Sequence, residues 1–214
     1  HGKAVNENRF MINESVTVSD FFPRFFGCFD RVEKRKIAAK FIEAEIEAQH
    51  EIEVNGKTSD DRYLGKIISV LPPSSATTSK WYILYEAPLQ NLRDFLDRNA
   101  QIAKSEVRWM VECLAKGIQA IHKCNLVFGN LQVESIEKVG KFWRIFDTSC
   151  CKPVGSMKSI DNLDMSYCAP ELVSNLLTSN LDDKLVHHHQ APMLFEHDMW
   201  NFGVILFELL TRKP

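Results

Sequence analysis

The sequence predicts an α+β fold in which a β-rich part precedes a mainly helical part. Apolar runs of strand length dominate up to about Glu86, and helical periodicity dominates after it. The chain has 214 residues, of which 45% are hydrophobic and 25% charged, as is typical of a globular protein with a core. The length suits one domain of two lobes, residues 1–86 and residues 87–214, or two small domains.

The first part is expected to be a sheet with one helix. Strand patterns cover Phe10–Val18, Phe21–Phe29, Arg35–Phe41, Leu64–Val70 and Trp81–Tyr85. A helix is expected over Glu43–Val54, with Ile42, Ile46 and His50 at helical spacing. Asn55-Gly56 should end it, because both residue types tolerate the left-handed conformation at a helix end. The segment Pro72–Ser79 predicts a loop.

The second part is expected to be mostly helical. Asn91 can cap a short helix whose Leu92, Phe95 and Leu96 share a face. Ser105–Cys124 is the clearest helix, with a stripe of Val107, Met110, Val111, Leu114, Ile118 and Ile121. Short strands are expected at Ser135–Lys138 and Phe142–Phe146, then an irregular segment from Asp147 to about Asp161. The chain closes on a largely apolar helix, Asp198–Leu210.

Composition excludes several classes of function. The net charge of -2, with no strongly basic half, gives no reason to expect nucleic-acid binding. No apolar stretch is long enough to span a bilayer, so we expect no membrane segment. The chain has 6 cysteines and no CxxC pair. Reduced thiols in a cytoplasmic protein are therefore the simplest interpretation.

Four segments in a fixed order carry a resemblance. They are Trp81–Glu86, Ile121–Val127, Tyr167–Glu171 and Asp198–Thr211. In sequence and spacing they resemble the eukaryotic protein-kinase family across the whole chain. The resemblance implies a bilobal fold, with a β-rich N-lobe holding one helix and a mainly helical C-lobe. It also implies that the last C-lobe helices are missing after Pro214, which would leave an exposed apolar face on Asp198–Leu210 and make the chain prone to self-association.

The resemblance also implies a nucleotide site. Ile37–Lys40 matches the family's strand motif, so Lys40 is the candidate phosphate-binding lysine. Glu51 is the best match for the glutamate that holds it, with Glu47 one turn earlier as an open alternative. Tyr85 falls at the gatekeeper position and Glu86 at the entry to the inter-lobe hinge. Without the resemblance, Lys40 would be read as a solvated strand lysine and the glutamates as an exposed helix face.

Other positions depart from the family pattern. The stretch Ser19–Gly27 lies where a glycine-rich loop should cover the phosphates, and Phe21, Pro23 and Arg24 would crowd a triphosphate there. Asn130 replaces the catalytic aspartate, and an amide cannot serve as a carboxylate base. Gln132, Ser135 and Gly129 replace the usual lysine, asparagine and arginine of the catalytic loop. We expect ATP and Mg²⁺ to bind weakly or not at all.

Asp147 stands at the position of the metal-binding aspartate and could ligate Mg²⁺. Thr148 and Ser149 replace the Phe and Gly that follow it in the family, and the alternative for Asp147 is a turn or capping aspartate. The leading hypothesis is a pseudokinase, a regulatory or scaffolding module that binds a protein partner. The alternative is a weak or atypical serine/threonine kinase that uses Lys40, Glu51 and Asp147 with an unorthodox base.

Overall fold

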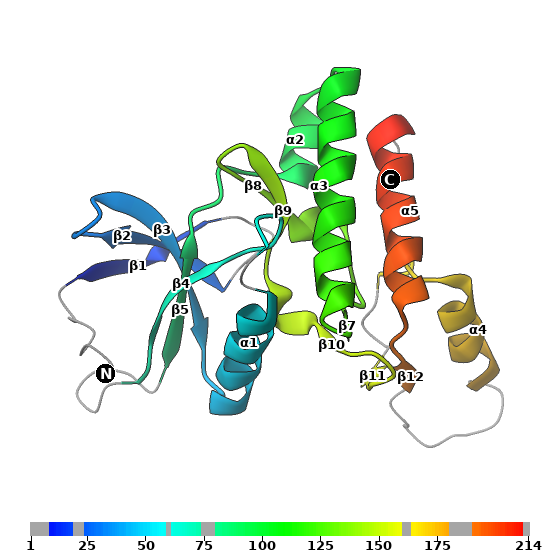
Figure 1. Ribbon diagram of the computed structural model, residues 1–214, viewed down its shortest axis with the longest axis horizontal. Coiled ribbons are helices and arrows are strands. Elements are labelled where there is room, and N and C mark those ends of the chain that lie inside the picture. The colour runs from blue at the N-terminus through cyan, green and yellow to red at the C-terminus, as the bar shows by residue number, and fades with distance from the viewer. Residues whose placement is uncertain are drawn as a thin grey trace.

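The computed structural model describes residues 9–18, 24–58, 61–73, 80–159, 164–179 and 190–211. A twisted sheet and one helix occupy one end of the molecule, and the remaining helices occupy the other end (Figure 1). The fold is the expected α+β arrangement of a β-rich part followed by a helical part. Most of the expected glycine-rich loop, residues 19–23, lies outside the described residues, as do residues 74–79 of the expected loop.

The sheet has five antiparallel strands in the order β1-β2-β3-β5-β4. Their bounds are β1 Phe10–Thr17, β2 Phe25–Asp30, β3 Arg35–Ile42, β4 Ile67–Leu71 and β5 Trp81–Glu86. Phe25 lies opposite Lys40, and Lys40 lies opposite Ile83. Directly opposed residues share a face, so this register turns all three side chains toward the same side of the sheet. Strand β4 begins later than expected, and Leu64 instead forms an isolated bridge to Ile145.

The single helix of the first part, α1, spans Glu45–Thr58 and corrects two expectations. It does not end at Asn55-Gly56. Asn55 is buried inside the helix, where its Nδ2 donates to the Gly65 carbonyl at 2.7 Å and its Oδ1 accepts from the Ile67 amide at 3.1 Å. Through these bonds the Asn55 side chain joins α1 to the segment that leads into β4, a role that the sequence alone does not reveal. The helix also begins later than expected, because Ile42 is the last residue of β3, and Ile46 is 81% exposed.

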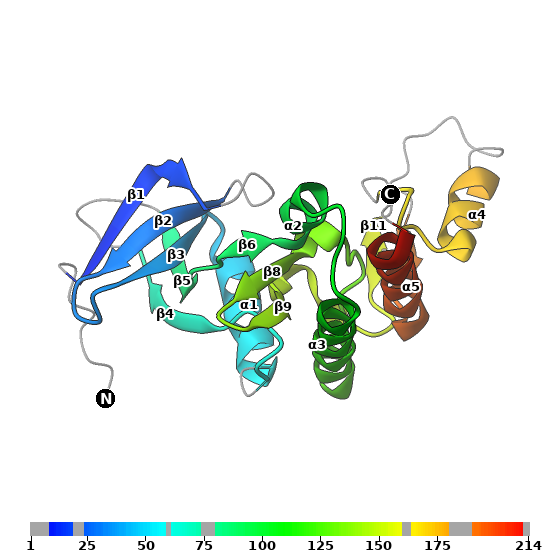
Figure 2. The same cartoon turned by 90° about the horizontal axis from the view of Figure 1, so that it is seen from above.

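The second part contains four helices among the described residues: α2 Leu92–Arg98, α3 Lys104–Lys123, α4 Pro170–Ser179 and α5 Phe195–Thr211. The Asn91 cap is confirmed, since its side chain accepts from the Arg93 amide at 2.8 Å. The α3 stripe is also confirmed, with Met110, Leu114 and Ile121 fully buried. Figure 2 shows α3 and α5 side by side, and α5 begins a few residues before the expected Asp198.

Short strands complete this part. The hairpin of β8 Ile136–Val139 and β9 Phe142–Ile145 pairs with β6 Gln90–Asn91. Two further pairs join β7 Leu126–Val127 to β10 Lys152–Pro153, and β11 Met157–Ser159 to β12 Gln190–Pro192. Two 3₁₀ turns, η1 Val133–Ser135 and η2 Thr148–Cys150, lie in the catalytic-loop region and after Asp147. The segment after Asp147 is therefore less irregular than expected.

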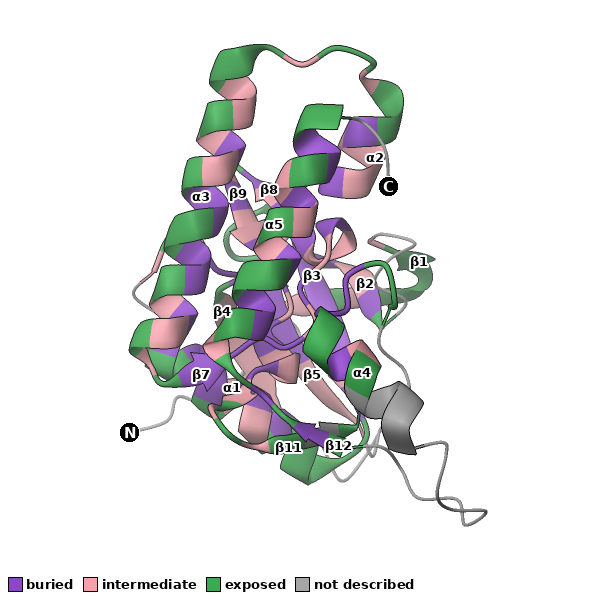
Figure 3. Ribbon diagram, turned by 90° about the vertical axis from the view of Figure 1, so that its right-hand side faces the viewer, coloured by how far each residue is buried: buried purple, intermediate pink, exposed green. Residues whose placement is uncertain are grey.

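Helix α5 packs one face on the core and leaves the other exposed (Figure 3). His197, Asp198, Ile205 and Leu209 are buried, whereas Trp200, Phe207 and Leu210 are exposed. The expectation of an exposed apolar face on this helix is met in the chain as it stands. No helix within the described part of the chain has the length and apolar character to cross a bilayer.

Candidate active site

Lys40 is the centre of the site. It is 4% exposed, and its Nζ lies 2.7 Å from Glu51 Oε2, 2.7 Å from Asp147 Oδ1 and 3.0 Å from Ser149 Oγ. A lysine ammonium carries three N–H donors, so these three acceptors engage all of them. The lysine, glutamate and aspartate singled out in the sequence are thus brought together from β3, α1 and the turn after β9.

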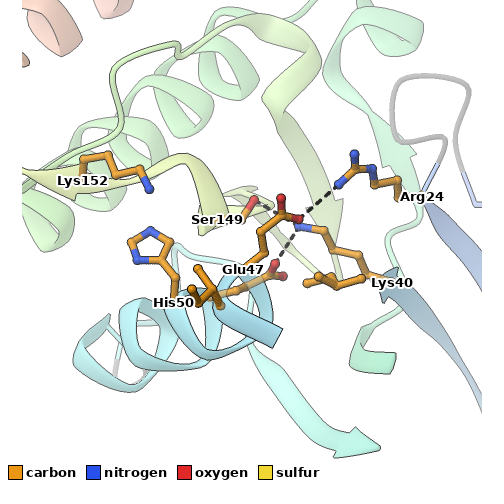
Figure 4. A pocket seen from close by; sticks show the side chains of 9 residues that line it. Arg24, Lys40, Glu47, His50, Ser149 and Lys152 are labelled. Atoms are coloured by element: carbon orange, nitrogen blue, oxygen red, sulfur yellow. Dashed lines mark hydrogen bonds and ion pairs between the residues drawn. The ribbon is translucent and has the colours of Figure 1, made fainter. Parts of the chain in front are cut away.

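The structure shows that Glu51, and not Glu47, is the glutamate that contacts Lys40. Glu51 is buried and contacts Lys40, whereas Glu47 is exposed and its Oε2 lies 3.7 Å from Arg24 Nη1, at a cavity that both glutamates line (Figure 4). The side chains of Arg24 and Glu47 are 61% and 59% exposed, so this pair contributes little stability. The pair nevertheless joins Arg24, a residue of the expected glycine-rich loop, to helix α1.

Burial and charge oppose each other in this cluster. Burial lowers the pKa of Lys40, but the negative charges of Asp147 and Glu51 outweigh it and raise that pKa overall. The ammonium therefore stays charged. Burial raises the pKa of Glu51, and the neighbouring Lys40 and the Tyr85 hydroxyl counteract part of that effect. A buried carboxylate is tolerated here because donors reach both of its oxygens.

Tyr85 contributes a contact that sequence reasoning missed. Its hydroxyl donates to Glu51 Oε1 and so links β5 to α1. Its ring packs against Phe25 and Phe146, with centroid separations of 5.5 Å to each. The two phenylalanine rings lie 5.3 Å apart, and all three side chains are buried. An aromatic cluster from β2, β5 and the end of β9 therefore fills the space beside Lys40.

Asp147 has the turn contacts expected of it in the alternative role, and it is also a charge partner of Lys40; its role as a metal ligand stays a prediction. Its side chain contacts Lys40 and also accepts from the Ser149 amide at 3.3 Å and the Ser149 hydroxyl at 2.6 Å. The backbone of Asp147 has φ 24° and ψ 76°, a conformation that non-glycine residues rarely adopt. The surrounding hydrogen bonds hold this strained geometry in place.

The residues present fit a magnesium ion only in part. Within the described ranges, no three His, Cys, Asp or Glu side chains gather as a metal site. Mg²⁺ can bind through one carboxylate together with substrate phosphates and water, so Asp147 would hold it with ligands from a nucleotide. Ser135, which replaces the asparagine of the family's catalytic loop, accepts through its Oγ from the Gln132 backbone amide at 3.4 Å. Magnesium would neutralise phosphate charge during transfer.

Glu86 turns its side chain toward the β8–β9 hairpin. It forms an ion pair with Arg144 of β9 across the boundary between the two parts. Next to it, Glu137 of β8 is 1% exposed and receives a hydrogen bond from Asn91 Nδ2 at 3.1 Å. Neither Arg144 nor Glu137 stood out in the sequence, since an alternating charge in a short strand is usually solvated.

Asp198 of α5 holds the backbone of the segment that matches the family's catalytic loop, residues 128–135. Asp198 accepts from the Phe128 amide at 2.8 Å, the Gly129 amide at 2.7 Å and the His122 ring at 2.9 Å. Gly129 has φ 74°, a backbone conformation that favours glycine. Asn130 follows it, and its Oδ1 accepts from Gln132 Nε2 at 3.1 Å.

A cavity of about 320 Å³ opens beside Lys40 (Figure 4). Arg24, His50, Ser149 and Lys152 line it together with Lys40 and α1 residues. His50 also contacts the Cys151 carbonyl at 2.9 Å and so ties α1 to the segment after Asp147. The cavity combines cations with the Lys40 cluster, and it could admit an anionic group.

The chain is similar to known serine/threonine-protein kinases. It is 27% identical over 178 residues to serine/threonine-protein kinase 1 of Heliothis zea nuclear polyhedrosis virus, covering 83% of this chain and 58% of that protein. It is 26% identical over 128 residues to serine/threonine-protein kinase 1 of Lymantria dispar multicapsid nuclear polyhedrosis virus, covering 59% of this chain and 40% of that protein.

A bovine relative is more distant. Serine/threonine-protein kinase 33 of Bos taurus is 22% identical over 164 residues, covering 64% of this chain and 28% of that protein. The chain thus spans less than two thirds of each of these relatives. The family model described as the protein kinase domain matches residues 22–214. With this match over nearly all of its length, and a β-rich part followed by a helical part, the chain belongs to the protein kinase family.

Proposed function

We propose that this chain is a catalytically impaired kinase domain that acts mainly as a regulatory binding module for a protein partner. The observation that carries the proposal is Asn130. It occupies the position of the family's catalytic aspartate, and its amide oxygen accepts a hydrogen bond from Gln132. An amide orients a hydroxyl but cannot take its proton at neutral pH. A missing acid–base group slows a reaction by about 10²–10⁴-fold.

The state of Lys40 also supports impairment. Its three donors are committed to Glu51, Asp147 and Ser149. A nucleotide phosphate would have to displace at least one of these acceptors, and the displaced carboxylate would need a new partner. We therefore propose that ATP binds weakly or not at all.

A cytoplasmic location is part of the same proposal. All six cysteines are free thiols in the structure, which suits a reducing compartment. In this compartment the domain would act more through binding a protein partner than through phosphoryl transfer.

A second candidate function is a weak serine/threonine kinase. The contact between Lys40 and Glu51, with Asp147 beside them, favours it because these are the positions that hold phosphates and metal in the family. The printed names of the viral and bovine relatives, all serine/threonine-protein kinases, point the same way.

Two measurements on purified protein test the proposal. We expect transfer of labelled phosphate from ATP to be at least about 10²-fold slower than for an active kinase. We also expect ATP, with or without Mg²⁺, to raise the melting temperature little, since stabilisation follows ligand affinity. Robust autophosphorylation that disappears in Lys40→Ala, with Lys57→Ala as the exposed-lysine control, would refute impairment. A large Mg²⁺-dependent shift that Asp147→Asn removes would refute weak nucleotide binding.

A further inference from the structure

The catalytic loop shares a small cavity with an aspartate from a distant segment. Asn130 and Asp164 both line this cavity of about 10 Å³, together with Tyr167, Cys168, His197 and Asn201. That volume is about the least that holds one water molecule. Asp164 thus lines the same small cavity as the residue that replaces the catalytic aspartate, although the two residues are 34 positions apart in the sequence.

The two segments are held together by one side chain of α5. Asn201 Oδ1 accepts from the Leu131 amide at 3.2 Å, and Asn201 Nδ2 donates to the Tyr167 carbonyl at 2.6 Å. The first bond fixes the residue after Asn130, and the second fixes the turn that begins at Asp164. Asn201 is 6% exposed, so this bridge is buried and the proximity of the two segments is built into the fold.

The other titratable groups around the cavity are not free to accept a proton. Tyr167 donates its hydroxyl to Glu208, and burial raises its pKa. Burial also raises the pKa of the Cys168 thiol, which therefore stays protonated. His197 accepts from the Leu194 amide through Nδ1 at 3.2 Å and directs Nε2 at Glu171, 3.5 Å away, so neither ring nitrogen has a lone pair to offer.

Asp164 differs from all of these. It is exposed, and one carboxylate oxygen, Oδ1, accepts from the Ser166 amide at 2.9 Å and closes a local turn. No donor within the described part of the chain contacts its Oδ2. A proton acceptor can act directly or through one water, and the cavity has room for one.

We propose that Asp164 replaces the missing catalytic aspartate as the general base for residual phosphoryl transfer, an inference that rests on the second candidate function above. Asp164 takes the proton of a serine or threonine hydroxyl, directly or through one water. As it does so, the hydroxyl oxygen bonds to the γ-phosphorus of a nucleoside triphosphate. The bond from that phosphorus to the bridging oxygen breaks, and the nucleoside diphosphate leaves with its electron pair. Asn130 orients the hydroxyl.

The test relocates the carboxylate. Single-turnover transfer from labelled ATP with Mg²⁺ to a degenerate serine/threonine peptide library is measured for wild type, Asp164→Asn, Asn130→Asp and the double variant N130D/D164N. Asparagine at 164 keeps an oxygen to accept from the Ser166 amide, so the turn should survive. The matched control is Asp61→Asn, which changes an aspartate that accepts from the Tyr63 amide at 2.8 Å in a similar turn elsewhere. Melting curves with and without ATP report folding and nucleotide binding independently of activity.

We expect Asp164→Asn to lower the residual rate at least about tenfold while the melting temperature and its response to ATP stay unchanged. The double variant should recover at least the wild-type rate, and Asp61→Asn should behave as wild type. An unchanged rate in Asp164→Asn overturns the inference. A wild type without transfer, beside an active Asn130→Asp, also overturns it, but that result supports the proposed impairment. If wild type and Asn130→Asp both lack transfer, the inference and the second candidate function fail together. Wild-type transfer at the rate of an active kinase would overturn the proposed impairment instead.

Discussion

Tyr85 is the residue whose contacts distinguish this site most clearly from a solvated lysine on a strand. Its hydroxyl supplies Glu51 with the donor that Lys40 cannot give to the second carboxylate oxygen. Glu51 would otherwise keep an unpartnered oxygen in a dry environment, which is costly. The hydroxyl at this position therefore stabilises the orientation of α1 against the sheet.

Replacing Tyr85 by Phe tests this role. Because Tyr85 and Glu51 are both buried, we expect Tyr85→Phe to lower the free energy of unfolding by about 1–3 kcal/mol. The matched control lies on the same strand, where the Tyr82 hydroxyl donates to the exposed Glu14. Tyr82→Phe should change the unfolding free energy by less than about 1 kcal/mol. Urea denaturation measures both, and equal effects would show that the Tyr85 hydroxyl is not special.

Glu137 gives the fold a dependence on pH. Burial raises its pKa to about 7, the Asn91 hydrogen bond opposes the rise, and the charge of Asp94 adds to it. Arg144, directly opposite on β9, is held by Glu86. The folded pKa lies above the ordinary value of 4.5, so the folded state binds the proton more tightly than the unfolded state does. The contribution of Glu137 to stability is therefore fully present below about pH 4.5 and is lost as the pH rises through about 7.

We expect Glu137→Gln to remove this loss. Relative to wild type, the variant should be more stable at pH 8 by about 2–3 kcal/mol, and by much less at pH 5, where the wild-type carboxyl is still protonated. Denaturation at the two pH values measures the difference. The same gain at both values would mean that packing rather than ionisation separates the two side chains.

At the scale of elements, helix α1 shows where a helix end predicted from the sequence differs from the end in the structure. Asn55-Gly56 is a common helix ending, yet α1 continues to Thr58. If Gly56 adopted the left-handed conformation, an added Cβ would be strained. In the structure it lies within the helix, and a Cβ there would meet nothing within 4 Å. We expect Gly56→Ala to raise the unfolding free energy by roughly 0.5–1 kcal/mol, measured by chemical denaturation. Destabilisation would restore the sequence-based helix end.

The elements that could be predicted are those whose signal is local. Helix α3 shows its buried stripe at every turn, and Asn91 sits beside the helix that it caps. Strands of two or three residues, such as β7 Leu126–Val127, have too few side chains to show a pattern. The end of α1 depends on Asn55 reaching Gly65 and Ile67, and such contacts are decided by tertiary packing.

In the candidate site, too, some residues could be predicted from the sequence and others could not. Lys40, Glu51 and Asp147 could be identified because the resemblance fixes their places along the chain, and the structure brings them into contact. The contact of Ser149 with Lys40 and the place of Asp164 at the cavity that Asn130 also lines could not be read from the sequence, because both depend on how distant segments pack. The roles of Ser149 and Asp164 in nucleotide binding or phosphoryl transfer stay predictions.

At the scale of the whole molecule, α5 presents an apolar face to solvent. Trp200, Phe207 and Leu210 are 44%, 53% and 73% exposed, and their helical spacing of about one or two turns places them on one side of α5. A groove of about 420 Å³ between α3 and α5, lined in part by Met199 and Phe202, adjoins them. Apolar patches of this kind on a monomer favour contact with another apolar surface.

We expect the 214-residue chain to self-associate through this face. Light scattering after size-exclusion chromatography should give a mass that rises with concentration, because burying apolar area stabilises the associated form. The double variant W200K/F207K should remain a monomer with a melting temperature close to wild type, since both side chains already contact water. Val32→Lys is the matched control, because Val32 is 65% exposed in the turn between β2 and β3, far from α5 in the fold (Figure 1). A wild-type mass equal to that of a monomer at every concentration would contradict self-association through the α5 face. Loss of association in Val32→Lys would indicate that the chains associate through the sheet instead.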